Sequence, residues 1–214
     1  MDEEITIIDT NTRNEKIKNF FINNRKIFFI TISIILVLLI GYFSFSEINK
    51  KNQIKLANQF NSTIVNFNND EKQKTTNKLV DIVNKQDATY SPLALYFLID
   101  NKLINTADEI NILFDVLIND VNLEREIKNL IIYKKALYNS NFIGENELIK
   151  ILNPIINSES IWKSHALYLV AEYFFSKNEK QKAKEFFNQI LIMQNANNDI
   201  KLEAQKRINR DISE

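Results

Sequence analysis

The chain has 214 residues, with 27 Lys and Arg against 27 Asp and Glu, one His, no Cys, two Gly and two Pro. The absence of Cys excludes disulfides, thiolate zinc sites and cysteine nucleophiles, a single imidazole cannot build a zinc site, and two glycines make no phosphate-binding loop. Because the formal charge is zero, the surface is also a poor match for nucleic acid, and the composition predicts no enzyme, no cofactor and no small-molecule substrate.

Residues 1–26 form a charged tail with five acids and five bases, the acids mostly ahead of the bases. One interpretation is a docking tail or a short amphipathic helix built on Ile17, Phe20, Phe21 and Ile22. The other is a disordered stub whose bases fix the membrane topology. We favour the stub.

Residues 27–46 carry no charge and are rich in Ile, Leu and Phe. At about 1.5 Å per residue this length spans roughly the 30 Å of a hydrocarbon core, and backbone in lipid must be helical to satisfy its hydrogen bonds. A buried core helix and a cleaved signal peptide are the alternatives. The apolar run is longer than a typical signal peptide's, and 26 residues precede it. The segment is therefore predicted to be an uncleaved single-pass anchor.

The charges on the two sides of this segment predict its orientation. Arg25 and Lys26 abut it, with further bases behind them, whereas the other side has Glu47 followed by Lys50, Lys51 and Lys55, so the asymmetry is modest. This asymmetry favours an N-terminus in the cytoplasm and residues 47–214 across the membrane. In a bacterium, the protein would sit in the inner membrane with this second part in the periplasm.

Beyond the anchor, apolar residues recur at helical spacing almost to the end of the chain. The predicted helices cover 47–68, 71–85, 91–103, 106–118, 123–138, 145–157, 160–177, 179–193 and 198–212. Thr106 with Glu109 has the capping-box pattern of a helix start, Pro92 fits the first helical position, and Pro154 is expected to end or bend its helix. Short polar connections make neighbouring helices antiparallel.

A repeat runs through these helices. Tyr96, Tyr133 and Tyr168 stand 37 and 35 residues apart, and Ala171, Ala183 and Phe187 supply the small and large packing residues of the last copy. The period is close to the tetratricopeptide repeat of about 34 residues. Because one helix pair cannot bury its apolar face alone, pairs stack on one another. The fold class is thus predicted to be all-α, a transmembrane helix followed by a tetratricopeptide-like α-solenoid of antiparallel helix pairs.

The layout resembles the ancillary SecYEG translocon subunit family, some of whose members are grouped with cell-division coordinator repeat domains. The likeness covers almost the whole chain and rests on Phe20-Phe21, on Asn24-Arg25-Lys26 before the anchor, and on the Ala171, Ala183 and Phe187 pattern. It departs at Asn139, where an aromatic residue is usual. The resemblance implies an inner-membrane, periplasm-facing protein that associates with the Sec translocon and with periplasmic chaperones of exported proteins.

A partner groove is predicted along the inner face of the first helix of each pair. By the repeat register it takes in Tyr133, Leu137, His165, Tyr168 and Glu172. The alternative is that the tyrosines pack between neighbouring helices with their hydroxyls in water. We favour this alternative, and we expect His165 to be a packing residue rather than a pH sensor. No catalytic, cofactor-binding or metal-ligating residue is predicted.

Two functions follow as expectations. The first is a membrane-anchored scaffold for protein–protein interaction in export, linking the Sec translocon to chaperones. The second is a structural scaffold of a cell-division or cell-wall assembly complex with the same fold and another partner.

Overall fold

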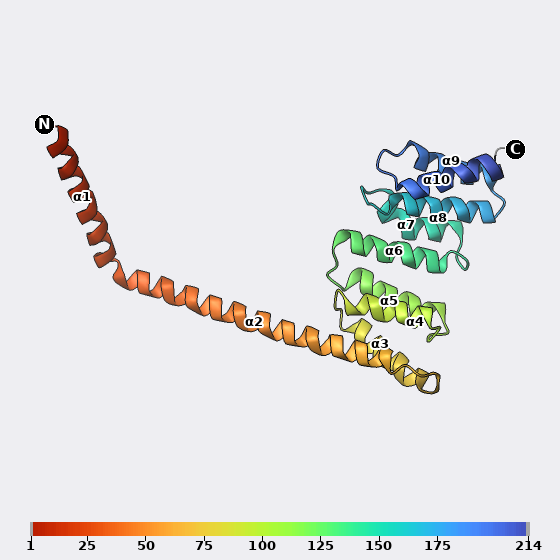
Figure 1. Ribbon diagram of the computed structural model, residues 1–214, viewed down its shortest axis with the longest axis horizontal. Coiled ribbons are helices and arrows are strands. Elements are labelled where there is room, and N and C mark those ends of the chain that lie inside the picture. Colours follow the sequence, from red (N-terminus) through yellow and green to blue (C-terminus); the bar gives the residue numbers. More distant parts are fainter. Residues whose placement is uncertain (1, 213–214) are drawn as a thin grey trace. The chain divides into compact units, whose positions relative to one another are not determined.

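The computed structural model describes residues 2–212, and the side chains of 13–68 and 70–212 among them. Every regular element in this described part is helical (Figure 1), as predicted. The chain divides into two compact units, Met1–Lys55 and Leu56–Glu214.

The first unit begins with two helices, α1 (Asp2–Asn23) and α2 (Arg25–Val65), which meet at Asn24. The Asn24 side-chain amide donates to the Phe20 carbonyl over 2.9 Å, in parallel with its own backbone N–H at 3.0 Å. This local bond offers the backbone an alternative to the regular helix. The expectation of a disordered stub is therefore wrong for residues 2–23, which are helical.

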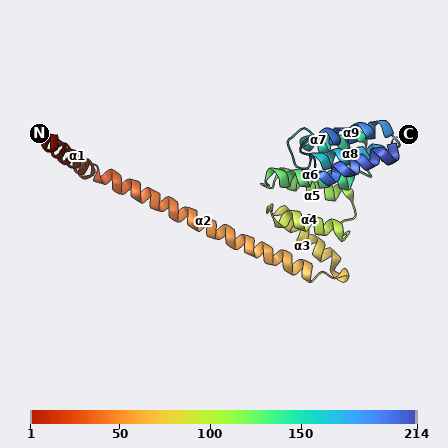
Figure 2. The same ribbon diagram turned by 45° about the horizontal axis from the view of Figure 1, so that its top comes forward.

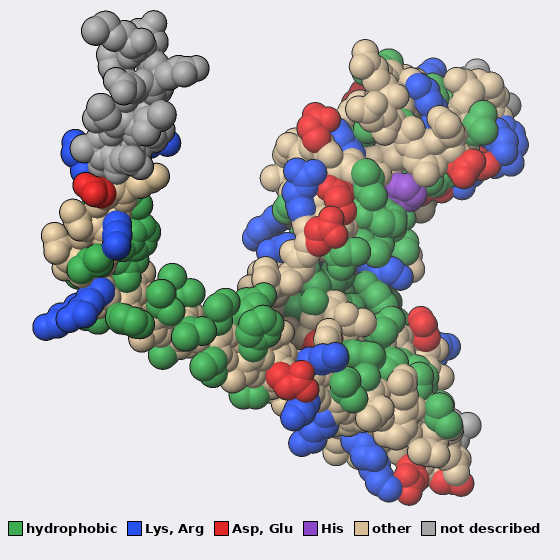
Figure 3. All heavy atoms as spheres, turned by 60° about the vertical axis from the view of Figure 1, so that its left-hand side comes forward, with side chains coloured by type: hydrophobic (Ala, Val, Ile, Leu, Met, Phe, Trp, Pro, Cys, Tyr) green, Lys and Arg blue, Asp and Glu red, His purple; other side chains and the backbone are tan. Residues whose placement is uncertain are grey.

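Helix α2 runs without interruption from the apolar stretch into the second unit, whereas separate helices over 27–46 and 47–68 were expected. Nothing in the sequence breaks it: Glu47, Lys50, Lys51 and Gln53 favour helix, and no Pro interrupts residues 25–65. Figure 3 shows hydrophobic side chains covering the surface of α2 over its apolar part. No residue of the most apolar stretch is buried, which excludes a core helix, and α2 is long and apolar enough to cross a membrane.

The second unit contains the end of α2 and all later elements, whose bounds lie within a few residues of the predicted ones. They are a short 3₁₀ turn (Asn69–Glu71), α3 (Lys72–Asn84), α4 (Tyr90–Asp100), α5 (Ala107–Asn119), α6 (Arg125–Asn139), α7 (Glu145–Ile156), α8 (Lys163–Ser176), α9 (Lys180–Ile192), α10 (Asn198–Arg207) and a π-helical turn (Ile208–Ile212). Helices adjacent in the chain pack on one another from α3 to α10, and α8 also contacts α6 and α10 (Figure 2).

Two hydrophobic clusters form the core of this unit. One joins α2 to α5 with the side of α6 that bears Ile131, around Leu79, Leu98 and Phe114. The other joins the side of α6 that bears Ile132 and Ala136 to the C-terminal elements, around Leu152, Phe174 and Phe187. The boundary falls between Ile131 and Ile132, two successive residues of α6. Successive residues point to different sides of a helix, so α6 contributes to both clusters.

Short polar side chains accept hydrogen bonds from backbone N–H groups at the starts of α4 and α5. Thr106 Oγ1 accepts from the Glu109 N–H at 3.4 Å, so the predicted cap of α5 is confirmed. For α4 the Asp87 carboxylate accepts from the Thr89 and Tyr90 N–H groups at 2.9 and 2.7 Å. This helix begins at Tyr90 and places Pro92 at its third position rather than its first. Pro can still be accommodated there. The backbone N–H groups of the first turn have no intrahelical acceptor, so the N–H that Pro lacks is not missed.

Three helix ends in the described part of the chain are followed by a left-handed residue that is not glycine, Gln86 after α3 and the two described next. Asn178 after α8 has φ 62° and Lys102 after α4 has φ 51°. In each case the next residue's N–H reaches back to a carbonyl near the helix end, Glu179 to Phe174 and Leu103 to Leu98, both at 2.9 Å. These are Schellman ends. They close the helices with Asn and Lys where Gly is usual.

Replacing Lys102 by Gly is expected to raise the free energy of unfolding by about 0.5–1 kcal/mol, because Gly relieves the left-handed strain but adds freedom to the unfolded chain. Lys102→Ala keeps the strain and serves as the matched control, with a change within about 0.5 kcal/mol. Denaturant unfolding of a fragment covering residues 47–214 measures both. A Gly variant no more stable than the Ala variant would contradict the left-handed assignment.

Candidate interaction surface

The five residues of the predicted groove lie on α6 and α8, but they do not line one continuous groove. Tyr133 and His165 lie together between α6 and α8. Tyr168 and Glu172 lie further along α8, where α10 packs. Leu137 lies on α6 at a pocket that also involves α4 and α5. The surface therefore consists of three successive contacts between alternate helices, α4 with α6, α6 with α8, and α8 with α10.

An aromatic cluster fills the contact between α6 and α8. The Tyr133 ring stacks on Trp162 with centroids 6.0 Å apart, and His165 lies 5.1 Å from Trp162 and 6.0 Å from Tyr133. Such ring pairs add to the burial of apolar area. Trp162 precedes α8 directly and anchors the start of this helix against Tyr133 of α6.

His165 is half-buried and its Nδ1 atom has no hydrogen-bond partner in the described residues. Burial disfavours the charged imidazolium and lowers the pKa of His165 below its ordinary value of 6.5. The side chain is therefore neutral at neutral pH and packs as an aromatic ring.

The stability of the 47–214 fragment is expected to fall as pH drops below about 6.5, the pKa of His in the unfolded chain. The folded pKa is lowered, so in this window the unfolded chain binds the proton first. Carboxylates titrate lower and the chain has one His, so the slope between pH 7 and 5.5 reports on His165 alone. Denaturant midpoints across this range test the expectation. His165→Phe is the control and should abolish the slope; a slope that survives would assign it to another group.

An ion pair occupies the contact between α8 and α10. Arg207 donates to both carboxylate oxygens of Glu172 at 2.7 and 2.6 Å and to Asp211 at 2.8 Å. Its guanidinium also lies 4.9 Å from the Phe175 ring centre. This bidentate geometry is the strong form of a charge-assisted hydrogen bond. Glu172 is thus bound within the chain and is not a free anchor for a partner.

Tyr168 lies beside this ion pair and packs on Phe187 with ring centroids 5.4 Å apart. Burial raises the pKa of Tyr168, and the negative charge of Glu172 raises it further. The hydroxyl is protonated throughout the physiological range. Tyr168 is therefore half-buried at a helix contact rather than presented on an open face.

The contact between α4 and α6 contains an open part of the predicted groove, at Leu137. Lys134 Nζ lies 4.3 Å from the centre of the Tyr96 ring, a cation–π contact, and burial raises the pKa of Tyr96 to about 12. Beside them is a pocket of about 300 Å³. Its lining is Tyr96, Ile99, Asp100, Phe114, Lys134, Leu137 and Tyr138. Leu137 is 48 % exposed, which makes it an apolar side chain available to a partner.

The sequence did not reveal two polar contacts that fix these helices. Asn139, 2 % exposed, exchanges two hydrogen bonds with Asn111 of α5, at 2.7 and 2.9 Å. Glu126 of α6 accepts from the Ser160 hydroxyl at 2.7 Å and from the Ile161 N–H at 3.2 Å, ahead of α8. These hydrogen bonds lower the pKa of Glu126. Both partners lie 28 to 35 residues away in sequence, so no local pattern signals them.

The described residues contain no group of three or more His, Asp or Glu side chains that would hold a metal ion. What the surface offers instead is apolar and aromatic packing with a few fixed charges. Comparison with family models, with curated proteins and with solved structures finds no match to this chain.

Proposed function

We propose that this protein is a membrane-anchored scaffold for protein–protein interaction, built from a transmembrane helix and a tetratricopeptide-like solenoid. In this proposal it is an ancillary subunit of the Sec translocon in a bacterial inner membrane. Residues 47–214 lie in the periplasm and link the translocon to chaperones of exported proteins. The solenoid's open groove between α4 and α6 takes the partner.

The observation that carries the proposal is the recurring position of three tyrosines. Tyr96, Tyr133 and Tyr168 lie on α4, α6 and α8, and each is half-buried. Each also meets the first helix of the next pair: Tyr96 meets Lys134, Tyr133 meets Trp162 and His165, and Tyr168 meets Arg207. Corresponding contacts at similar intervals, here 37 and 35 residues, are expected of stacked repeats, in which each unit packs on its neighbours.

The anchor and its orientation rest on α2 and its flanks. The side chains of the apolar stretch are exposed, which is unfavourable in water and favourable in the hydrocarbon core of a bilayer. Arg25 and Lys26 precede it directly, which favours a cytoplasmic N-terminus. The Sec translocon as the partner rests on the family resemblance of the layout, and the groove rests on Leu137, Lys134 and the pocket beside them.

Photo-crosslinking in cells tests the proposal. A benzophenone amino acid at position 137 is expected to crosslink one predominant protein, because this side chain is exposed at the pocket. Ile192, 81 % exposed on α9, is the matched control and should give no such product. Equal products from both positions would reject the groove.

The identity of the crosslinked protein decides the biological role. The Sec channel or a periplasmic chaperone supports an export function. Recovery of cell-wall synthesis or division proteins without any Sec component would contradict it and favour an envelope-assembly scaffold. Protease protection of residues 47–214 in intact spheroplasts would contradict the orientation.

A further inference from the structure

The last turns of α1 have a one-sided distribution of side chains. At 100° per residue, Ile17, Phe20 and Phe21 lie within about 100° of arc on one face of the helix. They are 50 %, 58 % and 53 % exposed. Lys16 and Lys18 lie at the two edges of this face, about 100° on either side of Ile17, and Glu15 and Asn19 lie opposite it. Ile22 lies outside the apolar face, and Arg13 lies on it, one turn before Ile17. An exposed apolar face with lysines at both edges is the pattern of a helix that lies in a membrane interface.

This face is continuous with the surface of α2. Phe28, in the first turn of α2, stacks on Phe21 with centroids 4.8 Å apart and meets Phe20 edge-on at 6.1 Å. The turn at Asn24 brings the three rings together, and the Phe28 N–H donates to the Asn24 carbonyl at 3.1 Å. Because the rings form one apolar surface, whatever apolar medium covers the start of α2 also covers Phe20 and Phe21.

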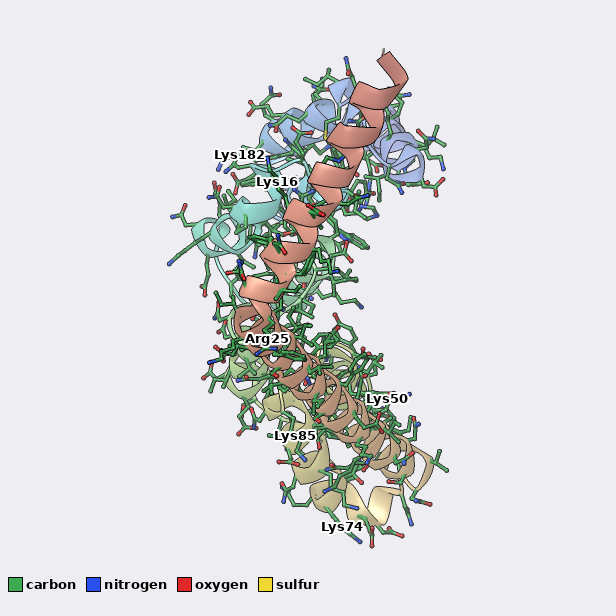
Figure 4. All side chains as sticks on the ribbon, turned by 90° about the vertical axis from the view of Figure 1, so that its left-hand side faces the viewer. Lys16, Arg25, Lys50, Lys74, Lys85 and Lys182 are labelled. Carbon is green, nitrogen blue, oxygen red and sulfur yellow. The ribbon has the colours of Figure 1, made fainter. Side chains whose placement is uncertain are left out.

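Basic side chains lie on both sides of the turn at Asn24. Arg25 and Lys26 follow it directly, and Figure 4 places Lys16 on α1 and Arg25 where α1 meets α2. These three bases, and also Lys18 and Arg13, are exposed. Glu15 is the one acid among residues 13–26. Long basic side chains next to an apolar face reach the phosphate level of a bilayer while their stems stay in apolar surroundings.

We propose that the C-terminal half of α1 lies on the membrane as an interfacial helix, with Ile17, Phe20 and Phe21 in the acyl boundary and the flanking bases on anionic lipid headgroups. This inference rests on the proposed anchoring of α2 in the bilayer. It gives the tail a surface that binds the membrane. The orientation of α2 in the membrane would require only the positive charges of Arg25 and Lys26.

Spin-label accessibility on the full-length protein tests this directly. The chain has no Cys, so each single Cys variant carries one label with no background. The protein is reconstituted in vesicles of phosphatidylcholine with phosphatidylglycerol, and collisions with oxygen, enriched in lipid, are compared with those of a water-soluble nickel chelate. Ile17→Cys and Phe20→Cys probe the apolar face, and Glu15→Cys and Asn19→Cys probe the opposite face. Leu36→Cys in α2 and Lys74→Cys in α3 are the references for lipid and water.

The ratio of the label's collision rate with oxygen to its collision rate with the nickel chelate is expected to be several-fold higher at positions 17 and 20 than at 15 and 19. Water-like values at 17 and 20 with a lipid-like value at 36 would overturn the interfacial helix and leave the anchor standing. A water-like value at 36 would overturn both proposals. Protection of 17 and 20 from both reagents in native membranes, with water-like values in vesicles, would assign the face to a protein instead.

The charge requirement is tested with the lipid composition and the lysines. Each of Lys16→Gln and Lys18→Gln is expected to lower the ratio of docked to undocked α1 about fivefold in anionic vesicles. In vesicles of phosphatidylcholine alone the same substitutions should have little effect. An equal loss in both lipids would contradict the headgroup contact.

Discussion

Phe187→Ala is expected to lower the free energy of unfolding of the 47–214 fragment by about 3–5 kcal/mol. Phe187 on α9 is fully buried, and its ring meets Tyr168 of α8 at 5.4 Å. The variant loses the burial of the ring and leaves a cavity that the surrounding helices fill only in part. Since single domains are stable by about 5–15 kcal/mol, this change removes a large share of the total. Urea or guanidinium unfolding followed by circular dichroism measures it.

The adjacent Phe186→Ala is the matched control, with the same change in volume at a half-exposed position. Phe186 stacks on Phe174 at 5.5 Å, so a smaller loss is expected rather than none. If the two variants lost equal stability, the inward face of α9 would be assigned wrongly.

Ala171→Leu is expected to cost about 1–3 kcal/mol by overpacking. Ala171 on α8 is fully buried. It belongs to the same hydrophobic cluster as Ala183 and Phe187 of α9, the helix on which α8 packs. Leu adds three carbons where the small residue lets the helices approach closely. The measurement is thermal or denaturant unfolding of the same fragment.

Glu179→Gln is the control for this second variant. Its carboxylate pairs with Lys182 at 2.7 Å, and the side chain is 41 % exposed. Exposed ion pairs contribute little, so the change should stay within about 0.5 kcal/mol. Equal losses in Ala171→Leu and Glu179→Gln would mean that the repeat register places the wrong residue at the helix contact.

The helices were predictable because their apolar spacing is local. Periodicity placed α3 to α10 within a few residues, and Thr106 marked the start of α5 because a cap acts over three residues. Asp87 was missed as the cap of α4. Pro is common at the first helical position, so Pro92 suggested a helix start with the preceding Ser91 as its cap. Ser91 instead bridges the Asp87 N–H and the Ile82 carbonyl, at 2.9 and 2.8 Å.

The groove was less predictable because it depends on contacts between distant segments. Tyr133 and His165, which the register assigned to the groove, lie on α6 and α8 with ring centroids 6.0 Å apart. It had no means of showing that Arg207, 35 residues beyond Glu172, takes that carboxylate. The Asn139 that departs from the family pattern is satisfied by Asn111, which again only the three-dimensional structure pairs.

The tail and the helix boundary after residue 46 were mispredicted. The charges of residues 1–26 suggested a stub, and the end of the uncharged run suggested the boundary. Asn and charged residues are nevertheless compatible with a helix, and the actual boundary falls at Asn24. There a side-chain amide competes with the backbone for a carbonyl.

The meeting of the two hydrophobic clusters at Ile131 and Ile132 has a consequence for how the second unit opens. Each cluster defines a set of helices that can lose protection together, and α6 contributes to both sets. Amide hydrogen exchange should therefore give two groups of opening energies, with the amides of α6 exchanging in the slower group. If the helices of one cluster unfolded, those of the other would stay folded as long as α6 stayed helical and packed. A partner bound at α4 and α6 would therefore stabilise both sets of helices.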